Sequence, residues 1–327
     1  MWQIGNIKVK GRVVLAPMAG ITSVGYRDFM IPFGVSLAYT EMVSDMGLIY
    51  ENDATLSYLP NKKSSIPIGI QLFGHDPKDI ANAAIICENK CKYFDFFDVN
   101  MGCPVPKVTK AGSGSALMLN PKNCGDIIRA IKEVSNKPVT AKIRLGYENN
   151  NHNFLEVIKE LEDAGIDAIA IHPRTRSEYY SGTAHYDEVV NLRDKMRVPL
   201  IISGDIFTLQ DALKALKITK ADAVMVARGG MGNPILITQI NEYLENNRDI
   251  MGSSLSEKIE YAVELADLLI EEKGELTAMR LFRGIVTNFF NGIPNCKPLK
   301  KRLSTELVDR ASLVKIFEEF KNEHNID

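Results

Sequence analysis

Short runs of β-branched and other apolar residues recur eight times in the first 230 or so residues, with helix signals between several of them. We predict strands at 13–17, 37–41, 66–72, 96–100, 139–145, 168–172, 199–203 and 223–227. Asp76-Pro77 and Asn120-Pro121 each predict a helix start, because Asp and Asn cap helices and proline fits the first turn. Eight β-α repeats indicate an α/β fold, a (β/α)8 TIM barrel.

The main alternative is an open doubly wound sheet, which usually carries a G-x-G-x-x-G loop after its first strand. That pattern is absent here, since the first predicted strand ends in Pro17-Met18-Ala19-Gly20. In the strand at 139–145, Thr140, Lys142 and Arg144 share one face, and in 66–72 Gln71 lies opposite the isoleucines. We expect these polar faces inside a barrel, with Gln71 and Lys142 near its mouth.

The strand pattern stops near residue 236, and helical periodicity continues to the end of the chain. We therefore predict a barrel over residues 1–240, followed by a smaller all-helical C-terminal domain over residues 241–327. A chain of 327 residues with 45% hydrophobic content is long enough to build both.

Composition narrows the function classes. A formal net charge of −2 gives no overall attraction to nucleic acid or membrane, so a polyanion would need a local patch. Five scattered cysteines fit a reducing compartment rather than a disulfide framework, and Cys87 and Cys91 are expected in the core. We find no signal peptide, no membrane span and no metal-ligand spacing, and so expect a cytoplasmic protein without a metal.

A lone cysteine, Cys103, follows the strand at 96–100 and lies between Gly102 and Pro104. Glycine permits a sharp turn and proline fixes its own backbone angle, so the thiol is held on a stiff loop. A glycine-rich stretch at 112–116 comes soon after. Most free cysteines act as small buried hydrophobic residues. This position at a strand end instead favours a thiol that a substrate can reach.

Polar or glycine residues lie at or just beyond the ends of most predicted strands, and a barrel brings such positions together at one mouth. They are Gln71, Asn100, Cys103, Lys142, His172, Arg174, Ser203, Gly204, Asp205, Arg228, Gly229 and Gly230. Barrels commonly bind phosphate after their last two strands through backbone amides. The glycines could instead be simple turns, but together with Lys142 they favour a phosphate-bearing cofactor.

These motifs, in their order along the chain, resemble those of the tRNA-dihydrouridine synthase family, most closely its bacterial branches. The resemblance rests on residues 16–22, 27–29, 41–42, 71–74, 98–107, 142–144, 172–182, 203–206 and 227–229. It implies a bound FMN and Cys103 as the proton donor. The implied cofactor contacts are Pro17, Met18, Ala19, Gln71, Lys142, His172, Ser203, Gly204, Asp205, Ala227, Arg228 and Gly229.

In the reaction that the resemblance implies, NADPH reduces FMN and a uridine of the tRNA D-loop leaves its stack to enter the barrel. Hydride moves from flavin N5 to uracil C6, and Cys103 protonates C5, while Asn100 binds the base or the flavin. A thiol with a pKa of about 8.5 is mostly protonated near neutral pH and suits this step. The family usually has Gly, Asn and Gly where this chain has Pro173, Ser203 and Ala227, so contacts there are expected to differ.

The resemblance also implies that the C-terminal helices hold tRNA. Residues 241–327 carry 12 Lys/Arg and 16 Asp/Glu, yet the window 280–302 is free of acidic residues. Its basic residues are Arg280, Arg283, Lys297, Lys300, Lys301 and Arg302, interleaved with Phe282, Phe289 and Phe290. We predict a phosphate-binding patch, the alternative being a solvated face beside a phenylalanine core. Further RNA contacts are expected at Arg174, Arg176 and Lys107, and no protein partner is implied.

Other functions remain open at this point. A flavin barrel acting on a free pyrimidine would have no need of the helical domain. A non-catalytic RNA-binding barrel, or a Schiff-base aldolase using Lys142, leaves Cys103 unexplained. The sequence does not indicate which D-loop uridine is reduced, whether NADPH or NADH is preferred, or the oligomeric state.

Overall fold

The computed structural model describes residues 1–324, which divide by their contacts into two compact units. The first unit combines Met1–Ala19 with Val35–Ala227, and the second combines Gly20–Gly34 with the chain from Arg228 onward. A segment of 15 residues early in the chain thus belongs with the C-terminal helices. The division at residue 240 that the sequence suggested stays a prediction about folding domains.

The first unit is built on an eight-stranded parallel sheet in the order β3-β10-β9-β8-β7-β6-β5-β4. Its strands are β3 (Val13–Leu15), β4 (Ala38–Ser44), β5 (Ile68–Phe73), β6 (Phe96–Met101), β7 (Val139–Arg144), β8 (Ala168–His172), β9 (Leu200–Ser203) and β10 (Ala223–Val226). A parallel bridge between Val14 and Leu37, with Leu15 N donating to Leu37 O at 2.9 Å, joins the two ends of that order. The sheet therefore closes into a barrel, and the predicted eight strands and barrel fold are confirmed.

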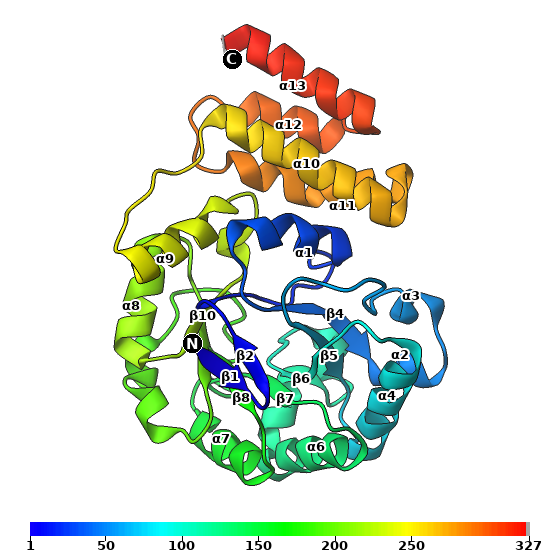
Figure 1. Cartoon of the computed structure of the whole chain (residues 1–327), viewed down its shortest axis with the longest axis vertical. Helices are drawn as coiled ribbons and strands as arrows, with labels where there is room; N and C mark the ends of the chain where they lie inside the picture. The colour runs from blue at the N-terminus through cyan, green and yellow to red at the C-terminus, as the bar shows by residue number, and fades with distance from the viewer. Residues whose placement is uncertain (325–327) are drawn as a thin grey trace. The chain divides into compact units, whose positions relative to one another are not determined.

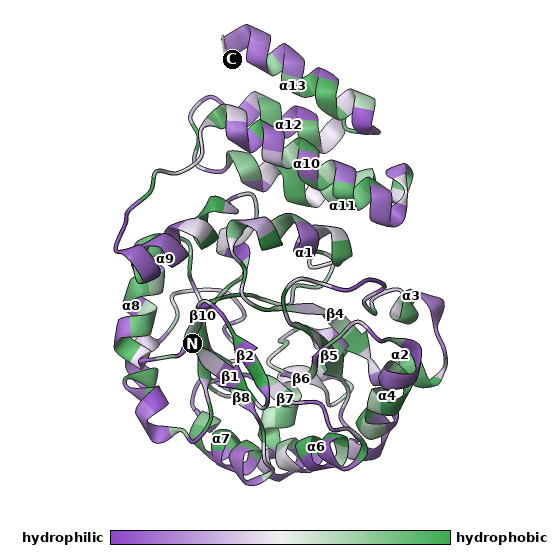
Figure 2. Cartoon of the chain, viewed as in Figure 1, coloured by the Kyte–Doolittle hydropathy of each residue, from purple (hydrophilic) through white to green (hydrophobic). Residues whose placement is uncertain are grey.

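Helices surround the barrel strands, as Figure 1 shows for α2, α4, α6, α7 and α8. The helices of this unit are α2 (Asp45–Ile49), α3 (Asp53–Leu56), α4 (Pro77–Lys90), α5 (Pro106–Thr109), η2 (Gly114–Leu119), α6 (Pro121–Val134), α7 (Phe154–Asp163), η3 (Tyr186–Val189), η4 (Leu192–Lys195) and α8 (Leu209–Thr219). Both predicted caps are present, since Asp76 accepts from Lys78 N and Asn120 accepts from Asn123 N. Figure 2 shows hydrophobic and hydrophilic residues on each of α6 and α7, as expected for helices with one face against a sheet.

A two-stranded antiparallel hairpin, β1 (Trp2–Ile4) with β2 (Ile7–Val9), precedes the barrel and was missed from the sequence. Its buried side chains Trp2, Ile4 and Val9 join one apolar cluster with the inward residues of the strands. Those inward residues are Val14, Ala16, Leu37, Tyr39, Phe96, Ala168, Ala170, Ile201, Ala223 and Met225. The lower barrel is therefore a packed apolar core, and polar groups are confined to positions further along the strands.

The second unit is helical. Its helices are α1 (Val24–Met30), η1 (Ile31–Phe33), η5 (Arg228–Gly230), α9 (Ile235–Asn246), α10 (Leu255–Lys273), α11 (Glu275–Val286), η6 (Thr287–Phe290), α12 (Lys297–Thr305) and α13 (Arg310–His324). Phe282, Phe289 and Phe290 are buried in its core. The helical C-terminal region is confirmed, and these phenylalanines are packing residues. No helix of residues 1–324 has the length and hydropathy needed to cross a membrane.

Candidate active site at the carboxyl ends of the barrel strands

The register of the parallel strands stacks polar side chains in layers inside the barrel. Gln71 and Thr140 are both paired with Asp98 across neighbouring strands, which makes the first layer. One step further toward the carboxyl ends, Asn100 is paired with Lys142. Since inward side chains alternate along a strand, these two layers lie directly above the apolar core.

Asp98 is 1% exposed and is the centre of the first layer. Its carboxylate accepts from Gln71 Nε2 at 2.6 Å and from Thr140 Oγ1 at 2.5 Å. Burial raises the pKa of Asp98 to about 6, although both hydrogen bonds and the charge of Lys142 act in the opposite direction. The role of Asp98 could not be predicted from the sequence, because a buried carboxylate in a strand has no distinctive spacing.

The loop that carries Cys103 is held by backbone hydrogen bonds on both sides of the residue. Asn100 Oδ1 accepts from Cys103 N at 2.8 Å and from Gly102 N at 3.2 Å. Cys103 O accepts from Ser115 N at 3.1 Å and from Ser115 Oγ at 2.9 Å. Gly114 has φ +62°, and a Cβ there would lie 2.8 Å from Cys103 O, so only glycine allows this approach.

Arg144 fastens the same loop from β7. Its Nε donates to Gly102 O at 2.8 Å, and its Nη1 donates to Thr175 O at 2.7 Å and Tyr179 O at 2.9 Å. Arg144 is 2% exposed, and its guanidinium links the loops that follow β6 and β8. The sequence placed Arg144 on the inner face but gave it no role, because its acceptors are backbone oxygens distant in sequence.

Cys103 differs from the other four cysteines. All five are free, but Cys87, Cys91, Cys124 and Cys296 are buried, whereas Cys103 is partly exposed. Burial raises the pKa of the Cys103 thiol, while a backbone hydrogen bond and the charges of Arg144 and Lys142 act to lower it. The thiol is therefore protonated at neutral pH, in a position that solvent reaches.

Lys142 is partly buried among these groups. Burial lowers its pKa to about 8, and the nearby charge of Arg144 contributes in the same direction. Within residues 1–324, no carboxylate lies within ion-pair distance of its ammonium, and the charge of Asp98 acts on it only from further away. A cation in this environment is costly unless an anion joins it, so the site is suited to an anionic ligand.

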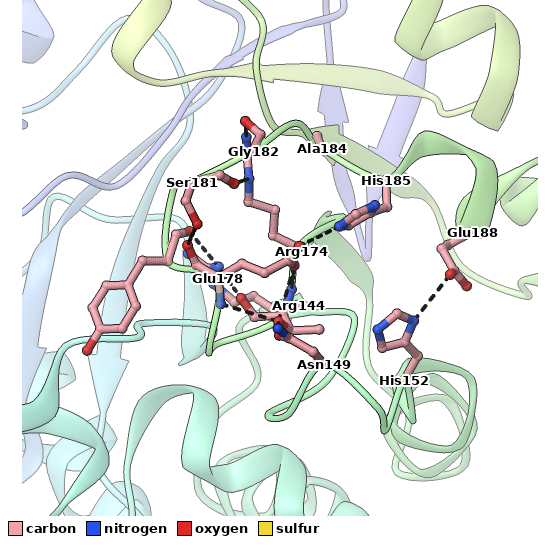
Figure 3. Close-up of polar contacts among 12 residues, drawn as sticks. Arg144, Asn149, His152, Arg174, Glu178, Ser181, Gly182, Ala184, His185 and Glu188 are labelled. Atoms are coloured by element: carbon pink, nitrogen blue, oxygen red, sulfur yellow. Dashed lines mark hydrogen bonds and ion pairs between the residues drawn. The ribbon is translucent and has the colours of Figure 1, made fainter.

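His172 ends β8 and belongs to a second polar cluster, drawn in part in Figure 3. Arg174 Nη1 lies 3.1 Å from His172 Nε2, and Arg174 also donates to both oxygens of Asp205 at 2.9 and 2.7 Å. Because a guanidinium only donates, Nε2 of His172 must be the acceptor and its proton must be on Nδ1. Gly204 has φ +112°, and a Cβ there would meet the His172 ring at 2.8 Å.

Arg174 is 1% exposed and also donates to Ser181 O and Gly182 O (Figure 3). Its guanidinium is thus committed to the loop after β8 and to Asp205. Arg174 and Asp205 form an ion pair in which the arginine is buried and the aspartate is partly exposed, and contact of Arg174 with RNA stays a prediction. Arg176 is more accessible and lies over the rings of Tyr147 and Tyr179, at 4.9 and 5.7 Å from their centroids.

The other predicted site residues of the first unit follow strand ends. Pro17, Met18 and Ala19 follow β3, Ser203 ends β9 and is buried, and Ala227 follows β10. Lys107 is exposed on α5, three residues beyond Pro104. Arg228 and Gly229 form part of η5 and belong to the second unit.

The basic residues of 280–302 differ in their exposure and in their hydrogen-bond and ion-pair partners. Arg280, Lys297 and Lys301 are exposed, and Lys300 donates to Asn291 Oδ1 at 2.7 Å. Arg283 donates to Leu307 O, and Arg302 forms ion pairs with Glu306 at 2.9 Å and Glu319 at 2.6 Å. Residues 280–302 contain no acidic residue, but Arg302 pairs with acidic residues that lie beyond this segment. Across residues 1–324, no group of three or more His, Cys, Asp or Glu side chains is arranged to hold a metal.

A closed parallel barrel with a protonated thiol, a lysine and amide side chains beyond its apolar core belongs to the class of (β/α)8 barrel enzymes. A family model described as dihydrouridine synthase matches residues 14–324. The chain belongs to the dihydrouridine synthase family, and so to a family of oxidoreductases.

Curated relatives agree with that assignment. A probable tRNA-dihydrouridine synthase of Rickettsia conorii is 34% identical over 301 residues, covering 90% of this chain and 89% of its own length. The tRNA-dihydrouridine synthase B of Pasteurella multocida is 34% identical over 294 residues, covering 90% of this chain and 88% of that one.

Two solved structures share the fold. One is an old yellow enzyme homologue of Zymomonas mobilis, with a TM-score of 0.50 and 13% identity over 78% of this chain and 94% of the other. The second is a histamine dehydrogenase of Rhizobium, with a TM-score of 0.55 and 16% identity over 81% of this chain and 50% of the other. At such identities the likeness concerns the fold alone.

Proposed function

We propose that this protein is a tRNA-dihydrouridine synthase that uses bound FMN and NADPH to reduce uridine in the tRNA D-loop. The single observation that carries the proposal is the partly exposed thiol of Cys103 in a barrel of this family, with its backbone held on both sides and with Lys142, which has no ion-pair partner in residues 1–324, acting on it electrostatically. In the balanced reaction, the C5–C6 double bond of uracil gains a hydride and a proton, and NADPH is oxidised to NADP⁺.

The residues present fit a flavin mononucleotide. Lys142 offers a cation without an ion-pair partner in residues 1–324, which suits an anionic ring or phosphate. Gly204 exposes backbone where any side chain would strike His172, and the Nδ1–H of His172 is fixed as a donor. A bound flavin would supply the hydride, and these residues would bind and orient it.

Cys103 supplies the proton. Its thiol is protonated at neutral pH, since the ordinary pKa of a thiol lies above 7 and burial raises it further. Its loop is held by Asn100, Ser115 and Arg144. Delivery of the thiol proton to uracil C5 leaves a thiolate, which regains a proton from solvent through its exposed side. A positioned acid of this kind contributes about 10²–10⁴-fold to a rate.

The tRNA substrate is suggested by the names of the relatives and by exposed basic residues. Lys297 and Lys301 lie on α12 and Arg280 lies on α11, all three exposed. Phosphate contacts need accessible cations, so these residues, together with Lys107 and Arg176 of the barrel unit, are the proposed RNA contacts.

The test combines purified protein, FMN, NADPH and an unmodified tRNA transcript, with dihydrouridine measured by mass spectrometry of the digested tRNA. We expect dihydrouridine in the D-loop and NADPH consumption in equal amounts. Cys103→Ala should keep FMN and NADPH-driven bleaching of the flavin absorbance, yet form dihydrouridine about 10²–10⁴-fold more slowly. Cys87→Ala is the matched control, because Cys87 is fully buried in α4 and its loss should lower stability alone.

Two results would contradict the proposal. Protein that binds no flavin on reconstitution would remove the cofactor, and reduction of free uracil or orotate without action on tRNA would indicate a small-pyrimidine dehydrogenase. Turnover of Cys103→Ala close to that of the wild type would leave the enzyme activity standing but assign the proton to another donor.

A further inference from the structure

A continuous chain of hydrogen bonds runs from the buried Asp98 to the backbone of Cys103. Gln71 Nε2 donates to Asp98 at 2.6 Å, and Gln71 Oε1 accepts from Asn100 Nδ2 at 2.8 Å. Asn100 Oδ1 then accepts from the amides of Cys103 and Gly102, at 2.8 and 3.2 Å. Two side-chain amides thus connect a carboxylate in the barrel to the loop of the thiol.

The groups at the two ends of this hydrogen-bond chain fix which amide atoms donate and which accept along it. An ionised carboxylate only accepts, and a backbone N–H only donates. Asp98 therefore holds the NH₂ group of Gln71 toward itself, which leaves the Gln71 oxygen facing Asn100. The Asn100 oxygen is consequently left for the amides of the Cys103 loop. Gln71 is 0% exposed, so water does not compete for these positions.

We propose that Asp98 is a positioning residue, which acts through Gln71 and Asn100 to hold the backbone of Cys103 in the orientation that the proton transfer needs. Asp98 does not touch the thiol loop itself. The importance of this role for catalysis rests on the proposed function of Cys103. The relay itself, meaning the hydrogen bonds from Asp98 through Gln71 and Asn100 to the Cys103 amide, can be measured without flavin or tRNA.

Loss of the carboxylate should propagate along the chain. Without it, the NH₂ group of Gln71 is buried without an acceptor, which is unfavourable, and the amide can turn over. A turned Gln71 would present a donor to the donor of Asn100, and a turned Asn100 would present a donor to Cys103 N. Asparagine at position 98 keeps an oxygen for Gln71 and gives Thr140 a donor, so it should preserve the direction.

The experiment measures hydrogen exchange of the Gly102 and Cys103 amides in five variants of the full chain. Asn100→Ala removes the direct acceptor, and Asp98→Leu and Gln71→Met each break the relay further back. We expect exchange about tenfold faster or more in all three, since about 1.4 kcal/mol of lost protection corresponds to a factor of ten. Asp98→Asn should restore protection. Thr140→Val, which touches Asp98 from its other side, should leave protection near that of the wild type.

The same variants provide a catalytic readout. Asp98→Leu and Gln71→Met should lower kcat for dihydrouridine formation, with Asp98→Asn close to the wild type and KM for tRNA unchanged in Asp98→Leu and Asp98→Asn. If Asp98→Leu fails to fold, Gln71→Met still breaks the relay and decides the matter.

The proposal would be overturned if Asp98→Leu and Gln71→Met exchange like the wild type while Asn100→Ala exchanges fast. Equal exchange in Asp98→Asn and Asp98→Leu would overturn it too, because the relay direction would then have no part. If the relay variants exchange faster but neither the wild type nor any variant forms dihydrouridine, the relay would be supported and the proposed function contradicted.

Discussion

At the scale of single residues, the site holds one group against its ordinary preference. Lys142 is an ammonium kept in a barrel without an ion-pair partner in the described chain. The Cys103 thiol, by contrast, is protonated at neutral pH as an ordinary thiol is, and burial raises its pKa further. Natural proteins accept such costs mainly where a ligand or a reaction uses the group. Lys142 can be tested directly, because replacing a charge that is costly to bury should increase the free energy of unfolding.

Lys142→Met should stabilise the flavin-free protein by about 1–2 kcal/mol at pH 7. The native pKa of about 8 lies below the ordinary 10.5, so the unfolded chain binds this proton more strongly. The cost is therefore fully present below pH 8, and stability rises with pH between about 8 and 10.5 as it disappears. Urea unfolding at pH 7 and pH 9.5 should show a larger gain for the variant at pH 7.

The same substitution should weaken flavin binding, although it stabilises the flavin-free protein. The apparent Kd for FMN should rise about tenfold or more, because one charge-assisted contact is lost. A variant that is neither more stable nor weaker in FMN binding would show that Lys142 is paired in solution. Lys132→Met is a suitable control, since Lys132 pairs with Asp167 at 2.8 Å outside the site.

At the scale of elements, α1 shows how a helix can depend on a residue far along the chain. Ser23 at its N-cap makes no capping bond with its own helix. Instead Glu272 of α10 accepts from Ser23 Oγ and Gly25 N, each at 2.7 Å, and from Val24 N at 3.3 Å. Burial alone would raise the pKa of Glu272, but these bonds and Lys273 hold it below its ordinary value.

Glu272→Ala should therefore destabilise α1 by about 1–2 kcal/mol at pH 7, the usual worth of a cap with a charge at a helix N-terminus. Because the native pKa is depressed, this contribution is present above pH 4.5 and is lost as the pH falls through the native pKa. Hydrogen exchange of the amides in residues 24–27 at pH 7 measures the effect. Glu271→Ala, an exposed neighbour on α10, should leave that exchange unchanged.

The same example shows what the sequence could and could not predict. The barrel strands were recognised because each is a short apolar run, and Asp76 and Asn120 mark their helices within four residues. The capping of α1 by Glu272 leaves no local pattern, since its partners are about 250 residues apart. The hairpin of β1 and β2 was missed for a related reason, because strands of three residues are too short to show alternation.

The site divides in the same way. Cys103 and Lys142 were found because a cysteine between glycine and proline, and a lysine inside a strand, are unusual in sequence. Asp98 and Arg144 received no role, because their importance comes from acceptors and donors that the fold brings to them. Contact of Arg174 with RNA stays a prediction, and its pairing with Asp205, 31 positions further along the chain, leaves no local pattern in the sequence.

At the scale of the whole molecule, the proposed binding of tRNA by a chain with net charge −2 would depend on a few accessible cations. The six basic residues of 280–302 looked equivalent in sequence, but the structure separates them by their partners. Arg302 is occupied by Glu306 and Glu319, whereas Lys297 and Lys301 are exposed on the same helix. The RNA patch is therefore expected to depend on the two lysines and not on the arginine.

Replacing both Lys297 and Lys301 by alanine should weaken tRNA binding and lower the slope of log Kd against log salt by about 1.5, since each phosphate contact contributes about 0.7–0.9. FMN content and flavin reduction by NADPH should stay unchanged. Lys315→Ala with Lys321→Ala alters the net charge equally on α13, and should leave the slope near that of the wild type. Arg302→Ala should lower the stability of the helical unit, with little effect on the slope. Binding titrations from 50 to 300 mM salt would decide the matter: equal slopes for the two double variants would mean that α12 is a solvated face, and Lys107 and Arg176 of the barrel unit would be the next residues to replace.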